Sequence, residues 1–319
     1  MSVNQATRAT PRMDLGKAIE EFYLNPEGLI ATKVFPVFAT QKKAATFSAI
    51  TRESMASTPD AKRGTAGNYN RINFDAEDKT YACQEFGLEN ALGDDERELY
   101  ASDFDAEMVA SKLAASKVLM AQEKRVAAII QNTTTFTGAA LFKSYAAAPW
   151  STVGSDIKLQ INFAKGKMRS NCGMSPNALI LSHNNFENLK NNSGVKAAIQ
   201  YTRAVTDQEL ANIIAPFLGL KYILVGGVSY NSATEGQAFV GADIWGDDYV
   251  NLAVIAENGQ DLSMPAIGRT FQWVADCPEN VLVEQYRDEA VRSDVFRARQ
   301  HIDSNLIDSS FGFMLKVTA

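Results

Sequence analysis

The chain has 319 residues, of which 46% are apolar and 21% are charged, and its net charge is −6. This length and composition suit a folded protein with up to two domains and a sizeable core. The acidic balance argues against a protein that binds nucleic acid over its whole surface, because such binding needs Lys and Arg to neutralise phosphates.

Sequence patterns argue against a disulfide-stabilised, membrane-spanning or secreted protein. The three cysteines are far apart and odd in number, so we expect reduced thiols in a cytosolic setting and no disulfide framework. No stretch approaches the ~20 apolar residues of a membrane span, so no membrane partner is expected. The polar first residues lack the apolar run of a signal peptide.

The first 40 residues predict three elements. Residues 1–11 show no periodicity and are expected to form a flexible arm. A short helix is predicted at 14–24, where the turn sequence Asn-Pro-Glu-Gly follows directly. A strand is predicted at 29–40 from its Val, Ile and Phe content, with Pro36 at a sheet edge or bulge.

Residues 42–80 predict a long two-stranded excursion with a loose tip. Small, polar and charged residues dominate 55–70, and Ile72 and Phe74 then alternate with polar neighbours like a returning strand. An isolated hairpin is marginally stable at best, and so long a loop is uncommon on a compact monomer. We therefore expect an arm that packs on another subunit, with a disordered insertion as the alternative.

The longest predicted helix spans residues 103–132, which contain no Pro or Gly. Ser102 or Asp103 is the expected N-cap. Three- and four-residue steps predict an apolar stripe made of Met108, Val109, Leu113, Leu119, Val126 and Ile130. Residues expected to lie mostly off this stripe are Ser111, Lys112, Lys117, Glu123 and Lys124.

The remaining elements fall into two groups. A strand is predicted at 81–88 and a helix from the cap Ser155 or Asp156 to Met168. An α/β unit follows, with helices predicted at 183–191 and 206–218 and strands at 177–181, 221–225, 238–240 and 249–256. Extended runs then dominate the end of the chain, at 268–275, 281–286, 291–302 and 311–317.

Motifs for catalysis or cofactor binding are missing from the sequence. Two histidines, His183 and His301, leave little for a metal site or a catalytic triad, and no phosphate loop or dinucleotide fingerprint is present. We expect no cofactor. The carboxylates of Asp243, Asp247 and Asp248 could hold a divalent cation, but a turn between strands uses the same residue types. A metal-dependent soluble hydrolase built on them is kept as an alternative function.

Three stretches of the chain carry a family resemblance: GLIATKVFPV at 28–37, GRTFQW at 268–273 and YRDEAVRSDV at 286–295. Together with the order of elements, they make the chain resemble the major capsid protein of tailed bacteriophages. The resemblance implies an α+β protein of the Hong Kong 97-type fold. Such a fold has an N-arm, an extended β-hairpin loop, a peripheral domain with a long spine helix, and an α/β axial domain.

The resemblance also implies a division of the chain. Residues 1–26 would form the N-terminal arm and 42–80 the extended loop. The peripheral domain would comprise 27–41, 81–170 with the spine helix 103–132, and the hairpin 271–305. The axial domain would be 171–270. Residues 306–319 would form a C-terminal strand, assigned to the axial domain or left outside it.

The implied function is structural and non-enzymatic. Copies of the chain would assemble as pentamers and hexamers into the icosahedral head shell of a phage, around double-stranded DNA that is contacted only non-specifically. Scaffolding, portal and decoration proteins are candidate partners, and the expected locations are the virion and, during assembly, the host bacterial cytoplasm. An encapsulin-like nanocompartment is the alternative within the fold. The candidate subunit-interface residues are Arg52, Lys62, Arg63, Arg71, Arg292, Asp294 and Arg297.

Overall fold

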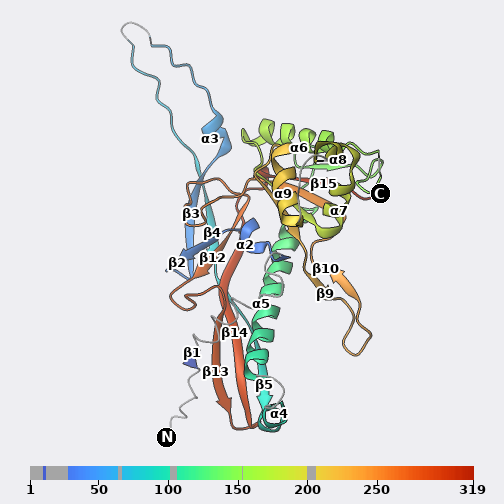
Figure 1. Cartoon of the computed structure of the whole chain (residues 1–319). Coiled ribbons are helices and arrows are strands. Elements are labelled where there is room, and N and C mark those ends of the chain that lie inside the picture. The colour runs from blue at the N-terminus through green and yellow to red at the C-terminus, as the bar shows by residue number, and fades with distance from the viewer. Residues whose placement is uncertain (1–9, 12–27, 64–66, 101–105, 153, 200–205) are drawn as a thin grey trace.

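The computed structural model describes residues 10–11, 28–63, 67–100, 106–152, 154–199 and 206–319. The molecule is elongated, with a long helix running along one sheet and a second α/β unit at one end (Figure 1). The helix predicted at 14–24 and the caps Ser102 and Asp103 lie outside the described residues.

A six-stranded sheet forms the long part of the molecule. Its strands follow the order β1-β13-β14-β12-β2, and β5 pairs with β14 outside this path. The long strand β14 pairs antiparallel with β13, β12 and β5, whereas β2 adds to β12 in parallel. The bounds are β1 (Thr10–Pro11), β2 (Val37–Thr40), β5 (Gln84–Gly93), β12 (Gly268–Trp273), β13 (Leu282–Asp288) and β14 (Ser293–Leu306).

A second, five-stranded sheet has the order β6-β15-β11-β7-β8. Strand β15 near the C-terminus lies inside this sheet, between β6 and β11. The strands are β6 (Phe142–Ser144), β7 (Ala178–Ser182), β8 (Tyr222–Gly226), β11 (Tyr249–Ala253) and β15 (Gly312–Lys316). The accompanying helices are α6 (Ile157–Cys172), α7 (His183–Asn191), α8 (Ser193–Ile199) and α9 (Asp207–Phe217).

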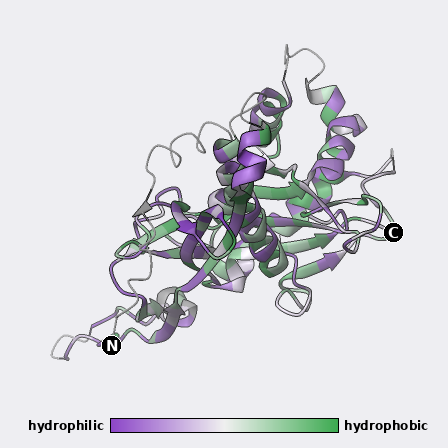
Figure 2. Ribbon diagram, turned by 90° about the horizontal axis from the view of Figure 1, so that it is seen from below, coloured by the Kyte–Doolittle hydropathy of each residue, from purple (hydrophilic) through white to green (hydrophobic). Residues whose placement is uncertain are grey.

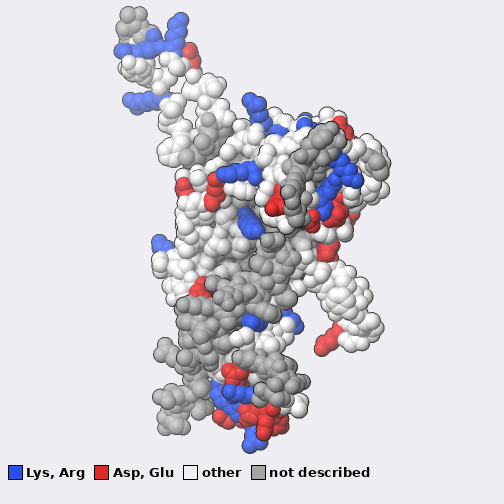
Figure 3. Space-filling model, in the orientation of Figure 1, with Lys and Arg blue, Asp and Glu red and all other residues white. Residues whose placement is uncertain are grey.

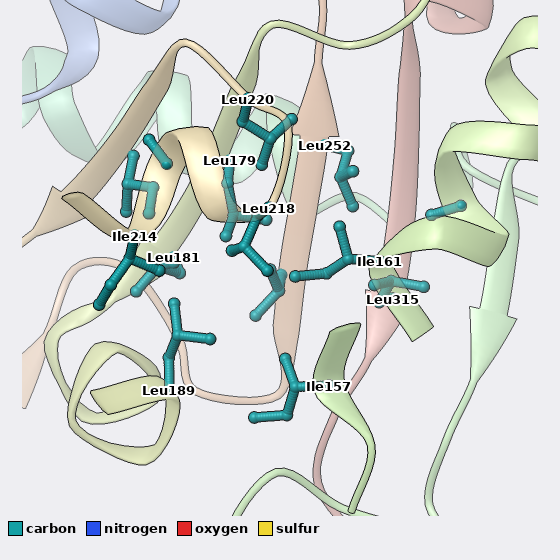
Figure 4. Close-up of a cluster of buried hydrophobic side chains, with 14 of the residues drawn as sticks. Ile157, Ile161, Leu179, Leu181, Leu189, Ile214, Leu218, Leu220, Leu252 and Leu315 are labelled. Carbon is teal, nitrogen blue, oxygen red and sulfur yellow. The ribbon is translucent and has the colours of Figure 1, made fainter. Parts of the chain in front are cut away.

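The core of the second unit is formed by aliphatic side chains between its sheet and its helices (Figure 4). Ile157 and Ile161 of α6 and Ile214 of α9 are fully buried against Leu179 of β7 and Leu252 of β11. Apolar residues concentrate on the interior strands, and polar residues lie on the surrounding helices (Figure 2). Helix α6 therefore packs with this unit, apart from the long helix.

Helix α5 (Ala106–Ile130) is the predicted long helix, but part of its predicted apolar stripe is wrong. Val109 and Leu113 are 48% and 45% exposed. Small residues, among them Ala110 and Ala114, face the six-stranded sheet instead and let the helix approach it closely. Two polar residues expected off the stripe, Ser111 and Glu123, are each only 1% exposed.

Four other predicted elements differ in the structure. The strand predicted at 81–88 is divided between the end of β4 (Ala76–Ala82) and the start of β5, which lie in different sheets. Residues 29–40 are not one strand, because α2 (Ala31–Val34) precedes β2. The strand predicted at 238–240 is displaced to β10 (Gly241–Asp243), which pairs with β9 (Ser229–Asn231) in a small hairpin. Ile72 and Phe74 lie before the returning strand, which begins at Ala76. The helices predicted near 156–168, 183–191 and 206–218 are confirmed by α6, α7 and α9.

The excursion is an antiparallel hairpin of β3 (Ala44–Ile50) and β4 (Ala76–Ala82), with the short helix α3 (Arg52–Ala56) beyond β3. It extends away from the rest of the molecule (Figure 1). At the opposite end, α4 (Asp94–Tyr100) follows β5 beside the β13–β14 turn. The molecule therefore has two distant ends with different surfaces.

Candidate assembly surfaces

The base of the β3–β4 hairpin is fixed to the six-stranded sheet by aromatic packing on Phe271 of β12. The Tyr81 ring stacks on Phe271 with centroids 4.3 Å apart, and the Phe47 and Phe38 rings lie at 5.4 and 5.8 Å. Phe271 is fully buried, and the Lys79 ammonium donates to the Ile307 carbonyl at 2.8 Å. The hairpin is therefore firmly anchored at its base.

The tip of the hairpin carries Lys and Arg side chains (Figure 3) together with exposed aromatic residues. Tyr69, Ile72 and Phe74 are each 73% exposed, which is unusual for large apolar side chains on a folded surface. The Arg63 guanidinium lies 4.6 Å from the Tyr69 ring centroid and donates to its hydroxyl at 3.3 Å. A tip of this composition is suited to burial against another molecule.

The interface candidates on this tip are accessible where the structure describes them. Lys62, Arg63 and Arg71 are exposed, and the backbone N–H of Lys62 donates to Asp60. Arg52 lies in α3, and its side chain is outside the described part of the structure. Their role in assembly stays a prediction.

The far end of the six-stranded sheet carries a network of ion pairs. Arg287 of β13 makes a bidentate pair with Asp94 of α4, with N–O distances of 2.5 and 2.6 Å. This hydrogen bonding holds the pKa of the Asp94 carboxyl below its ordinary value. Asp294 of β14 contacts Arg97 at 3.0 Å and Arg287 at 3.5 Å. The network joins α4 to the β13–β14 hairpin.

The remaining interface candidates lie in or near this network. Arg297 contacts Glu89 at 2.7 Å and Glu284 at 3.6 Å, and its guanidinium lies 5.0 Å from the Tyr286 ring centroid. Arg297 and Asp294 therefore have partners within their own subunit. Arg292 is exposed at the β13–β14 turn, with a positive φ of 48°. The structure gathers these three residues at one end, far from the hairpin tip.

The buried carboxylate of Glu123 connects three elements that are distant in sequence. It accepts hydrogen bonds from the backbone N–H groups of Ile30 and Ala31, at 2.9 and 2.8 Å. The indole N–H of Trp245 donates to the same carboxylate at 2.6 Å. Burial raises the pKa of Glu123, although these three donors and nearby Lys33 act in the opposite direction. Glu123 thereby joins α5 to the start of α2 and to the turn after β10.

A second projecting hairpin, formed by β9 and β10, was not predicted from the sequence. Phe239 and Val240 near it are 73% and 54% exposed. The Lys124 ammonium on α5 lies 4.3 Å from the ring centroid of Tyr230 in β9. Only the apolar character of 238–240 could have indicated this element, because its two strands have three residues each.

Two of the three acidic residues considered for a metal site, Asp247 and Asp248, bind protein groups. Asp247 accepts from the hydroxyl of Ser182 at 2.5 Å and from the side-chain amide of Asn184 at 2.8 Å. Asp248 accepts from the Thr318 hydroxyl at 2.6 Å. Among the described residues, no group of three or more His, Cys, Asp or Glu could hold a metal ion. These carboxylates fix the turn between β10 and β11.

Both histidines lie outside any catalytic arrangement. His301 of β14 is 3% exposed, and its Nδ1 lies 2.9 Å from the Asp276 carboxylate. Hydrogen bonds from His301 and Arg299 hold the pKa of Asp276 below its ordinary value, although burial acts in the opposite direction. His183 is exposed at the start of α7, 3.9 Å from Glu187. Over the described residues, no helix is long and apolar enough to cross a membrane.

Comparison with known proteins gives one sequence relative and several related structures. The chain matches no protein-family model. The major capsid protein of Burkholderia phage BcepMu is 25% identical over 281 residues, which cover 86% of this chain and 88% of that protein. A phage-related protein from Bordetella bronchiseptica RB50 is 21% identical, with a TM-score of 0.68 and coverage of 97% of this chain and 98% of its own. The capsid of cyanophage P-SCSP1u is 12% identical, with a TM-score of 0.57 and coverage of 99% and 90%.

The relative and the capsid structures confirm the resemblance drawn from the sequence. The α+β architecture with a projecting hairpin and a long helix is the expected Hong Kong 97-type fold. The hydrolase and nanocompartment alternatives are not favoured by these comparisons. The chain therefore has the Hong Kong 97-type fold and is similar in sequence to a phage major capsid protein, and these comparisons support a structural, non-enzymatic protein of the phage head shell.

Proposed function

We propose that the subunits assemble as pentamers and hexamers in which the β3–β4 hairpin of each copy packs on a neighbouring copy. The observation that carries this proposal is the set of exposed apolar side chains at the tip of a hairpin whose described contacts with the sheet lie at its base. Tyr69, Ile72 and Phe74 are 73% exposed in the single chain. Ring contacts between identical subunits are head-to-tail and need two different complementary surfaces on each copy. The tip supplies one of these surfaces.

We assign the six-stranded sheet and α5 to a peripheral domain and the five-stranded sheet to an axial domain. This assignment moves β6 and α6 out of the peripheral segment 81–170, because α6 buries Ile157 and Ile161 against the second sheet. Strand β15 joins the axial domain, because it pairs with β11. Residues 1–26 are proposed as the N-terminal arm.

The proposal includes the partners of the shell. Scaffolding, portal and decoration proteins would join the assembling particles in the host cytoplasm. Packaged double-stranded DNA would meet the inner wall without sequence-specific contacts. The net charge of −6 supports this last point, because like charges repel and keep the DNA from adhering to the wall. A strongly basic inner face in the assembled particle would contradict it.

The experiment is a deletion of residues 54–74, which removes the exposed Tyr69, Ile72 and Phe74 but keeps β3 and β4, compared with the wild-type chain. We expect the deleted chain to remain folded, because the aromatic contacts of Phe271 at the hairpin base are retained. Circular dichroism and thermal unfolding report folding, and negative-stain microscopy and sedimentation report particles. Wild-type chains should form uniform particles and deleted chains should not. Normal particles from the deleted chain, or unfolding of that chain, would contradict the proposed role of the loop.

A further inference from the structure

A surface cavity of about 240 Å³ lies between α2 and α5. Its volume is several times the ~30 Å³ that one water occupies in the liquid, so it has room for a side chain. Thr32 and Lys33 are exposed at its rim. The other lining residues are Leu29, Ala31, Leu119, Gln122, Glu123 and Asn280.

Two buried polar side chains that line the cavity have atoms without hydrogen-bond partners. Gln122 is 1% exposed, and neither its Nε2 nor its Oε1 has a hydrogen-bond partner within the described ranges. The same holds for the buried Oδ1 of Asn280. Buried amide groups are nearly always paired in folded proteins, because an unpaired one loses its hydration without compensation. A ligand that both donates and accepts a hydrogen bond could satisfy the Gln122 amide.

The chemistry of the lining narrows the ligand to an apolar group with a neutral polar end. Leu29, Ala31 and Leu119 offer an apolar wall beside the unpaired Gln122 amide. A carboxylate is disfavoured here, because the Glu123 carboxylate lines the same cavity. A phenol fits both requirements, since its ring is apolar and its hydroxyl donates and accepts. A phenylalanine ring would leave the amide unpaired.

A second copy of the chain offers such a group at the hairpin tip. Tyr69 is 73% exposed, and among the tyrosines whose side chains are described no other exceeds 37%. The hairpin extends away from α2 and α5 of its own subunit, so its tip is presented to another molecule (Figure 1). We propose that Tyr69 of one copy inserts into the α2–α5 cavity of a neighbouring copy, with its hydroxyl bonded to Gln122. This inference rests on the proposed assembly of copies through the hairpin.

The first test compares Tyr69→Phe, Gln122→Leu and the double variant. Particle stability is measured as the denaturant midpoint of dissociation and as the apparent association constant of the subunits. Tyr69→Phe should weaken association roughly tenfold per contact, because it leaves the Gln122 amide unpaired. In a chain that already carries Gln122→Leu, Tyr69→Phe should have almost no further effect on association, because the effects of mutating two residues in direct contact are not additive. Tyr222→Phe is the matched control, because Tyr222 is 37% exposed and lies on β8.

The second test is thiol cross-linking in the full chain with Cys172→Ser, because Cys83 and Cys277 are buried. Tyr69→Cys combined with Thr32→Cys at the rim should give inter-subunit products with a short thiol cross-linker. Tyr69→Cys combined with Thr152→Cys should not, because residue 152 lies outside the cavity lining. If wild-type particles form, but cross-links are absent and Tyr69→Phe is silent, the cavity is not the docking site and the shell assembly stands. If the wild-type chain forms no particles, the proposed assembly fails with this inference.

Discussion

Replacing Glu123 tests how the long helix is tied to the rest of the subunit. The carboxylate is 1% exposed and accepts from two backbone N–H groups and from the Trp245 indole. Glu123→Ala removes the acceptor and leaves all three donors buried without a partner. Each such donor costs about 1–3 kcal/mol, so we expect a loss of free energy of unfolding on the order of 4 kcal/mol. That is a large share of the ~5–15 kcal/mol that stabilises a typical domain.

Glu123→Gln separates the charge from the shape of the side chain. The amide keeps one oxygen acceptor but places an N–H₂ group opposite a buried N–H, so we expect a smaller loss of about 2 kcal/mol. Burial raises the pKa of Glu123 above its value in the unfolded chain, so the folded state binds the proton more tightly. The advantage of wild type over Glu123→Gln should therefore be greatest at acidic pH and decrease as pH rises through the folded pKa.

The assay is urea unfolding of the unassembled subunit, isolated by size exclusion and followed by tryptophan fluorescence. The indole of Trp245 is fully buried and bonded to Glu123, so it contributes a signal from this region to the emission of the three tryptophans. Lys117→Ala is the control, because Lys117 is exposed on the same helix. A Glu123→Ala midpoint equal to that of Lys117→Ala would refute the reasoning. So would a wild-type advantage over Glu123→Gln that increases with pH in the acidic range.

Two further predictions concern Val126 of α5, which packs in a cluster with α2 and strands of the five-stranded sheet, and Phe271, which anchors the hairpin to the six-stranded sheet. Val126→Asp should unfold the subunit, because it places an unpaired charge at a fully buried position. Circular dichroism measures the loss of helix, and a variant that stays folded would contradict the prediction. Phe271→Ala should cost about 3–5 kcal/mol, because Phe271 is fully buried against the Tyr81 and Phe47 rings. Faster proteolysis at the base of the hairpin should accompany that loss, and unchanged cleavage would show that other contacts anchor it.

The elements that the sequence determined alone depend on interactions between residues close in the chain. Thr206 and Glu209 form a capping box three residues apart, and the Asp156 and Ser182 side chains cap α6 and α7 in the same local way. The starts of these helices were therefore predictable. The projecting hairpin of β3 and β4 was also predictable. Small, polar and charged residues dominate 55–70, so this stretch cannot form a core of its own. Element order and three short stretches were enough to indicate the family.

The tertiary structure decided which face of α5 is buried and where its charged residues lie. Periodicity favours a stripe with Val109 and Leu113, but the sheet accepts the alanine face, where small side chains allow close approach. The burial of Glu123 depends on backbone donors 92 and 93 residues away, which no local pattern contains. The same long-range contact caps α2, where a strand was predicted. Local sequence therefore determined the starts of α6, α7 and α9, whereas contacts between distant segments decided the conformation of α2, the buried face of α5 and the α2–α5 cavity.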